Sequence, residues 1–436
     1  MNAVTSPAMP TWDSVTTAHD AYDRAPDADE VELYVHDSTE ATTTLEPRTP
    51  QFVSVQGRVL AYGCRLWRDG RAAGRGRSVS GLDDLVDLMV ETDHALNTSG
   101  RPTALPHAVR LTPDQRGPDC GPLSMSDVER LAERTATAVR DRGGKVQAVV
   151  AHHFYTLMGI TTRSGGEAVQ YMPTERVQVR CETPHGPITD ACGQAAIGPA
   201  LDISAMVERY ADALDALAGP GAPPPADLPV VFRPAVAGPL VAGLGWLLTG
   251  STAVDTPGLA RAVGKRLFPS CLSADDPGSA EGEHLPVADN EGHPVLPVDL
   301  VRDGRLVGFL HSARTASALD VPRNGRGLRM GIPGMPEPTP IRFRVAADRG
   351  HVPDDHVELS CRLDTMNPMP RTGQIELIAA GWVVRGGKRI SRVAPFEFRC
   401  DVLRYWRQLI GTGHDPVRLP GANESTTPSL VFRGLP

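Results

Sequence analysis

The chain has 436 residues, which is long enough to bury a sizeable core and predicts two or three domains. Its composition, with 41% hydrophobic and 22% charged residues, is typical of a soluble globular protein. The formal net charge of -8 argues against nucleic acid as a direct ligand, because nucleic-acid-binding surfaces are basic.

Three further features bear on location. The longest apolar run, 235–248, is shorter than the roughly 20 residues that span a bilayer and contains Pro239, so we expect a buried helix rather than a membrane segment. The seven cysteines are scattered and form no CxxC pair, which favours a reducing compartment. Residues 1–30 carry neither the basic nor the apolar part of a secretory signal, and we interpret them as a polar leader. We therefore expect a cytoplasmic protein without a membrane segment.

The next part of the chain alternates predicted strands with predicted helices. Strands of a meander are expected in 31–78, with a hairpin turn at Arg68-Asp69-Gly70-Arg71. Apolar residues at helical spacing predict helices, and two alternating segments predict further strands. The predicted helices are 80–96, 123–143 and 202–219, and the further strands are 146–165 and 168–193. We interpret 31–217 as an N-terminal α+β domain.

The Pro/Gly-rich segment 218–229 cannot continue a helix or a central strand, and we interpret it as a linker. Residues 230–436 are mostly strand and turn, with hairpin signals at 302–305 and 385–388 and a closing helix near 401–411. The predicted fold class is therefore α+β, with a sheet-and-helix N-terminal domain followed by a β-rich, antiparallel, barrel-like C-terminal domain.

The segment Val230–Gly250 begins the C-terminal domain as a short buried strand and an apolar helix, with Pro234 expected at the first helical position. It contains no His, Glu, Asp or Cys. A divalent metal needs converging nitrogen, oxygen or sulfur donors, and metal-assisted hydrolysis needs a base for the attacking water. This segment can supply neither.

Three blocks of the sequence resemble the TldD/PmbA family of paired bacterial proteins, once called modulators of DNA gyrase. They are PVVFRPAVAGPLV at 229–241, the segment 273–319 with its DNEG, DGRLVGFL and HSARTASAL motifs, and MNPMPRTGQIELIAAGWVVRGGKRI at 366–390. The resemblance implies a two-subunit metallopeptidase. Its TldD-type subunit carries HExxxH on the helix after the VV strand, which supplies two His ligands and a catalytic Glu.

In this chain the corresponding helix reads AGPLVAGLGWLLTG, which resembles the PmbA/TldE branch of that family. The resemblance implies a non-catalytic subunit that holds no metal of its own. The divalent metal, zinc by expectation, would lie on a TldD-like partner carrying HExxxH. Peptides are then the expected substrates, with maturation of a peptidic natural product as one use, and the assembly is a hetero-oligomer, with a homodimer as the state of the chain alone.

Four residues near the DNEG block are candidate chamber or interface residues, and none is expected to be catalytic. His311 and Arg314 belong to HSARTASAL, the block that carries most of the resemblance. Arg326 and Arg329 lie in the Gly-rich segment 324–331, which either lines a peptide chamber or forms a solvated loop.

Two other functions are also compatible with the sequence. One is a homodimeric protein that binds a peptide or an intermediate without hydrolysing it. Another is an amidase-like enzyme with a relocated site, for which Cys361, His351 and His356 are the residues to test. The adjacent His152 and His153 are expected to point to opposite faces of a strand, so they cannot jointly bind one metal ion.

Overall fold

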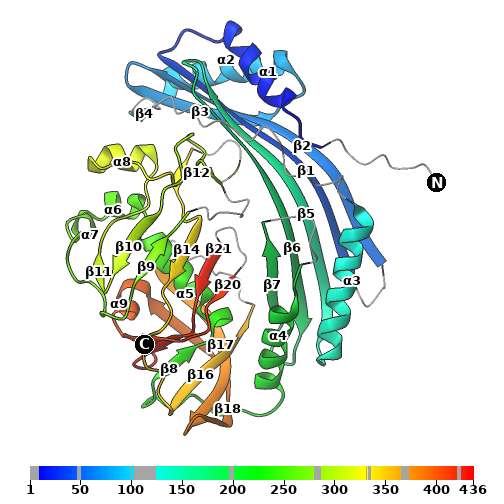
Figure 1. Ribbon diagram of the computed structural model, residues 1–436, viewed down its shortest axis with the longest axis vertical. Helices are drawn as coiled ribbons and strands as arrows, with labels where there is room; N and C mark the ends of the chain where they lie inside the picture. Colours follow the sequence, from blue (N-terminus) through cyan, green and yellow to red (C-terminus); the bar gives the residue numbers. More distant parts are fainter. Residues whose placement is uncertain are drawn as a thin grey trace.

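The computed structural model describes residues 9–46, 51–99, 101–102, 124–195, 201–278, 286–329, 331, 335–364, 373–419 and 424–436. A long N-terminal sheet bends around a C-terminal region that is built from two further sheets (Figure 1). The molecule is α+β, as the sequence predicts.

The N-terminal sheet is antiparallel and has the strand order β4-β3-β2-β1-β5-β6-β7. Its strands are β1 (Glu30–Glu46), β2 (Gln51–Arg68), β3 (Arg71–Ser78), β4 (Arg101–Pro102), β5 (Lys145–Thr162), β6 (Glu167–Glu182) and β7 (Ile188–Gln194). The predicted hairpin turn joins β2 to β3, where Asp69 and Gly70 adopt positive φ angles of 51° and 69°. Two residues with positive φ form the type of turn that matches the twist of paired strands.

Helices cover one face of this sheet, here called the outer face. They are α1 (Asp13–Ala21), α2 (Leu82–Ser99) and α3 (Met125–Asp141), and the short 3-10 helix η1 (Tyr22–Arg24) follows α1. Part of the predicted polar leader therefore forms a helix. Val15 and Ala18 of this helix, α1, are fully buried against the sheet. Their spacing of three residues gives α1 an apolar stripe despite its polar composition. The helix α4 (Ser204–Leu217) lies beside β7.

The C-terminal region has two sheets, with the orders β11-β10-β9-β14-β21-β20 and β15-β19-β22-β8-β16-β17-β18, and a small pair, β12-β13. The first contains β9 (Ala274–Asp276), β10 (Val298–Arg302), β11 (Arg305–Leu306), β14 (Arg342–Val345), β20 (Val417–Leu419) and β21 (Glu424–Thr427). The second contains β8 (Val230–Phe232), β15 (Arg349–Gly350), β16 (His356–Leu363), β17 (Gln374–Arg385), β18 (Lys388–Asp401), β19 (Leu409–Thr412) and β22 (Leu430–Phe432). The pair is β12 (Gly327–Leu328) and β13 (Glu337–Pro338).

The barrel-like description of this region needs correction, because both sheets are open and end in different strands. They are also mixed, since β8 pairs with β16 and β14 with β21 in parallel. Parallel neighbours require crossover connections, and here these long connections contain helices as well as strands of the other sheet. The helices are α5 (Pro234–Leu247), α6 (Gly250–Asp255), α7 (Pro257–Ala260), α8 (Ala313–Leu319) and α9 (Val402–Trp406). The predicted closing helix is α9, and strands follow it.

The apolar helix α5 lies between the two C-terminal sheets and forms the centre of their core. It contacts β16 and β17 of one sheet and β14, β20 and β21 of the other. Pro234 occupies its first turn as predicted, and Val236, Leu240 and Leu244 are fully buried. Gly245 keeps the helix close to the neighbouring sheet, because a Cβ there would lie 3.2 Å from Pro340. In the described parts of the chain, no helix is both long and apolar enough to cross a membrane.

Candidate functional site

The C-terminal region touches the N-terminal sheet at two separated places. At one end of the long strands, the Gln170 side chain accepts a hydrogen bond from the amide of Val287 at 2.8 Å and donates one to the carbonyl of Ala288 at 3.0 Å. At the other end, the Thr189 hydroxyl donates to Asp364 at 2.7 Å. The two contacts differ in chemistry, and the middle of the sheet lies between them.

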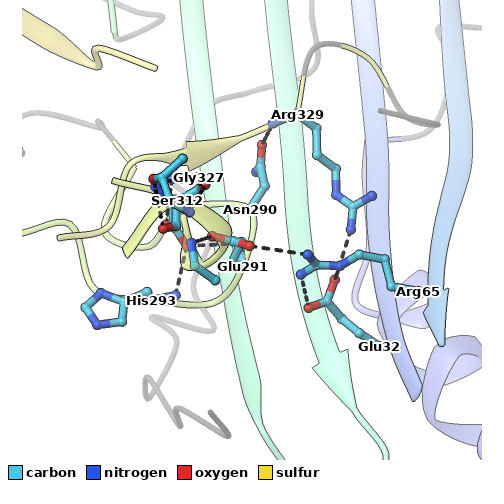
Figure 2. Close-up of polar contacts among 11 residues, drawn as sticks. Glu32, Arg65, Asn290, Glu291, His293, Ser312, Gly327 and Arg329 are labelled. Carbon is cyan, nitrogen blue, oxygen red and sulfur yellow. Dashed lines mark hydrogen bonds and ion pairs between the residues drawn. The ribbon is translucent and has the colours of Figure 1, made fainter. Parts of the chain in front are cut away.

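The first contact is centred on a buried ionic network between β1, β2 and the segments 289–292 and 326–329 (Figure 2). Arg65 donates two hydrogen bonds to Glu32, at 2.7 and 2.5 Å, and lies 3.3 Å from Glu291. Arg329 donates to the same Glu32 carboxylate at 2.9 Å. All four side chains are nearly inaccessible to solvent. We call these four residues the ionic junction.

The loop that presents Glu291 is held by its own backbone. Asp289 accepts from the amides of Glu291 and His293, each at 2.9 Å, and from the amide of Gly327 at 2.8 Å. Burial, followed by the nearby charge of Glu291, raises the pKa of Asp289 to about 7. Glu291 also accepts from the amide of Ala313 at 2.6 Å, so it satisfies a free donor at the start of α8.

Gly327 allows this close packing. A Cβ at Gly327 would lie 2.2 Å from the Glu291 carboxylate, so any other residue would displace that carboxylate. The DNEG loop, the start of α8 and strand β12 therefore form one unit that faces β1 and β2 (Figure 2).

The second contact is apolar in its centre and charged at its rim. Buried residues of α4 share one hydrophobic cluster with Leu363 and Trp382 of the second C-terminal sheet. At the rim, Asp212 of α4 pairs with Arg389 at 2.5 Å and Asp215 with Arg392 at 3.0 Å. We call this contact the apolar junction.

Between the junctions lies the concave face, which is the face of β1, β5 and β6 opposite the outer face. The register aligns two rows of side chains across it, Glu40-Phe154-Thr174 and Thr42-His152-Arg176. All six of these residues are partly exposed. No hydrogen bond or ion pair among the described residues joins them to the C-terminal region. The concave face therefore presents polar and aromatic groups that are partly exposed and make no polar contact with the described residues of the C-terminal region.

His152 lies on this face, and the neighbouring His153 lies on the outer face, as predicted. His153 is buried and contacts Glu175 at 2.9 Å, whereas Nδ1 of His152 lies 3.0 Å from the Thr42 hydroxyl. The His152 ring also stacks on Phe154, with 5.4 Å between ring centroids. Burial, and to a lesser extent the charge of Arg176, lowers the pKa of His152. His152 is therefore neutral at neutral pH.

Two of the residues singled out from sequence lie beside the DNEG unit. His311 is buried, its Nδ1 lies 3.3 Å from the Thr315 hydroxyl, and burial lowers its pKa to about 4. Arg314 is exposed and pairs with Glu337 at 2.7 Å. His311 precedes α8 and Arg314 lies in its first turn, and their side chains face different surroundings.

The two arginines of the Gly-rich segment are both buried. Arg326 is fully inaccessible; its Nη2 pairs with Asp276 at 2.9 Å and donates to the carbonyl of Leu296 at 2.8 Å. Arg329 belongs to the ionic junction. Their guanidinium groups hold the chain's own segments together in this arrangement.

The sequence reasoning did not single out Glu32, Arg65, Glu291 or Arg176. A charged residue on an alternating strand is usually on the solvent side, so Glu32 and Arg65 carry no local sign of burial. Arg65 contacts Glu291, which lies 226 residues away along the chain, and Glu32 contacts Arg329, which lies 297 residues away. The only available signal for Glu291 is its position in the DNEG motif.

The residues of the relocated-site reading do not form a metal or thiolate centre in the described parts of the chain. Cys361 lies in an apolar cluster, and burial raises its thiol pKa to about 12. The ring of His356 contacts the carbonyl of Pro353 at 2.6 Å, and His351 is exposed. No group of three or more His, Cys, Asp or Glu side chains among the described residues could hold a metal ion.

Helix α5 likewise offers no metal ligand, because its residues are Ala, Gly, Leu, Val, Pro and Trp and most of them are buried. The described residues of this chain therefore do not fit a divalent metal.

Comparison with known proteins identifies the C-terminal half and the overall fold. Residues 225–436 match the PmbA/TldA metallopeptidase C-terminal domain. No curated protein matches the chain. The fold is that of TldE from Thermococcus kodakarensis, with a TM-score of 0.80 at 15% identity over 97% of this chain and 99% of that one.

Two proteins described as proposed modulators of DNA gyrase share the fold as well. The one from Thermotoga maritima has a TM-score of 0.72 at 17% identity, over 93% of this chain and 95% of that one. The one from Bacteroides thetaiotaomicron has a TM-score of 0.71 at 15% identity, over 98% and 99%. Residues 225–436 therefore match a domain of the PmbA/TldA type, and the chain as a whole shares the fold of these three structures.

Proposed function

We propose that this chain is the non-catalytic, PmbA/TldE-like subunit of a two-subunit metallopeptidase that processes peptides. The observation that carries the proposal is helix α5. It occupies the place after the buried strand β8 where the TldD-type subunit carries HExxxH, yet it has no metal ligand and no general base. The metal, which we expect to be zinc, then belongs to a TldD-like partner.

The retained fold still has a task in such an assembly. The concave face has partly exposed side chains between the two junctions and can form one wall of a substrate chamber. Unfolded peptides can also bind by adding a strand to an open sheet edge, because backbone hydrogen bonds depend little on sequence. Among the described residues, segment 264–267 already pairs with edge strand β11, and Ala222 pairs with Val393 of edge strand β18, so β20 and β15 are the edges that remain for such binding.

The test is a purification of the tagged full-length chain from its native cells, with identification of bound proteins by mass spectrometry. We expect a near-stoichiometric partner that contains HExxxH. The reconstituted pair should cleave unfolded peptides, and a metal chelator should abolish that cleavage. A partner variant in which Gln replaces the Glu of HExxxH should bind equally well and be inactive.

Two results would contradict the proposal. One is chelator-sensitive peptide cleavage by this chain alone. The other is recovery of this chain only with itself, which would favour the homodimeric binding protein. A substrate that is the precursor of a peptidic natural product would be recognised by its accumulation when the gene is deleted.

A further inference from the structure

The concave face carries an arginine that no carboxylate of the described residues neutralises. Arg176 of β6 is partly exposed, and it makes no ion pair with any described residue. Its Nε atom is buried and has no hydrogen-bond partner. A guanidinium in such surroundings is incompletely solvated, so an arriving anion interacts with it more strongly than it would in bulk water.

Several other arginines at the surface of the molecule form ion pairs with neighbouring carboxylates. A surface hollow of about 700 Å³ on the first C-terminal sheet is lined by Arg302, Arg344 and Arg349 among others. Each of the three pairs with a carboxylate that lines the same hollow: Asp299, Asp275 and Asp303, respectively. On β6 itself, Arg180 lies 3.9 Å from Asp364. Arg176 differs from these arginines, because it has no carboxylate partner among the described residues and its Nε atom is buried without a hydrogen bond.

The neighbours of Arg176 suit an anion rather than a cation. His152 stands opposite it on β5 and is neutral at neutral pH. When the Thr42 hydroxyl donates to Nδ1 of His152, the ring proton lies on Nε2, which can then donate to a ligand. On the other side, Gly193 of β7 has no side chain to cover the guanidinium. Glu40 stands two strands away in the next row, roughly 12 Å from Arg176 by strand spacing.

We infer that Arg176, with His152 beside it, forms a subsite that binds a carboxylate of a peptide lying on the concave face. Arginine recognises carboxylates through two parallel hydrogen bonds, and the neutral imidazole adds a third donor without a second full charge. The inference rests on the proposed function for the identity of the ligand as a peptide. It concerns binding only, so it is tested apart from hydrolysis.

The experiment measures fluorescence anisotropy of an amino-terminally labelled, alanine-rich decapeptide on the full-length chain and on the assembled pair with its inactive partner. Three forms are compared: a free C-terminal carboxylate, a C-terminal amide, and the amide with one internal Glu. We expect the wild type to bind a carboxylate-bearing form about tenfold more tightly than the plain amide. Tight binding of the peptide with the free C-terminus would indicate a subsite for a terminal carboxylate. Tight binding of the amide with an internal Glu would indicate a subsite for a side-chain carboxylate.

Variants connect the effect to Arg176. Arg176→Gln should abolish the preference, and Arg176→Lys should retain part of it, because lysine keeps the charge but loses the paired hydrogen bonds. Arg180→Gln is the matched control, since it removes one positive charge from the same face of the same strand, and it should keep the preference. Equal thermal unfolding midpoints show that the variants fold.

Equal affinity of the wild type for all three peptides, or no binding of any of them, overturns the subsite. A preference that survives in Arg176→Gln overturns it as well. A carboxylate preference found in a chain that has no HExxxH partner would instead overturn the proposed function and leave the subsite intact.

Discussion

The two junctions between the N-terminal sheet and the C-terminal region solve the same packing problem with opposite chemistry. The ionic junction buries two arginines and two glutamates, whereas the apolar junction packs Leu363 and Trp382 against α4. Apolar contacts stabilise a junction over a range of geometries, because the hydrophobic effect has no direction. A buried ion pair contributes little net stability but penalises every arrangement that leaves a charge unpaired.

The difference assigns each junction a role. The apolar junction holds the two parts together, and the ionic junction fixes the orientation of the DNEG loop over the end of β1 and β2 (Figure 2). Both junctions are needed to hold the concave face in this arrangement, because the N-terminal sheet could rotate relative to the C-terminal region about a single contact.

The largest effect is expected from removal of Glu32, which pairs with both arginines of the ionic junction. Glu32→Ala leaves the guanidinium groups of Arg65 and Arg329 buried near each other, with Glu291 as the remaining carboxylate of the ionic junction. We expect the free energy of unfolding to fall by about 3–5 kcal/mol, measured by urea denaturation.

Glu40→Ala is the control for this change. Glu40 lies on the same strand and face, is partly exposed and makes no ion pair with a described residue, so its loss should change stability by less than about 0.5 kcal/mol. Equal stability of Glu32→Ala and the wild type would show that the network is not coupled to folding.

A smaller effect is expected at the apolar junction. Leu363→Ala removes a buried side chain that is 3% exposed and leaves a cavity against the α4 cluster. We expect a loss of about 2 kcal/mol, the lower end for buried leucines, because Leu363 is the last residue of β16 and its surroundings can relax.

Ile390→Ala in the same sheet is the matched change, since Ile390 is 60% exposed and its truncation should cost little. Should Leu363→Ala cost no more than Ile390→Ala, the apolar junction would not be the part that holds the molecule together.

The local features of this comparison could be predicted from the sequence. The hairpin turns at Asp69-Gly70 and Asp303-Gly304 have the positive φ angles that their residue types favour, and Pro234 begins α5 as expected. These predictions succeed because each depends on a few neighbouring residues. The absence of donors from α5 is likewise visible in the sequence itself.

The junctions could not be predicted, because their partners are distant in sequence. Nothing near Arg329 distinguishes an arginine that binds a peptide from one that binds Glu32, 297 residues away. The burial of Val15 in the predicted leader and the parallel pairing of β8 with β16 also depend on the assembled fold. Arg176 shows the same limit, since only the register reveals that no acid stands opposite it.

The smallest effect concerns how the free energy of unfolding depends on pH through His311, which lies near the ionic junction. His311 precedes α8, whose first amide is held by Glu291, and burial lowers the pKa of His311 to about 4. A depressed pKa means that the unfolded chain, with a histidine pKa near 6.5, binds a proton more readily than the folded one. The stability contributed by neutral His311 is therefore present above about pH 6.5 and is lost as the pH falls toward 4.

At pH 5.5 this linkage should lower the stability of the wild type by about 1 kcal/mol relative to pH 7.5, when compared with His311→Gln at the same two values. Asp289 makes the opposite contribution, because its raised pKa stabilises the fold as the pH falls through 7. Both proteins contain Asp289, so the comparison between them cancels this contribution. A difference between wild type and variant that stays constant from pH 7.5 to pH 5.5 would mean that His311 becomes protonated without opening the packing around α8. Protonation of His311 would then not destabilise the ionic junction through α8. Only the removal of one of its charged side chains would destabilise it.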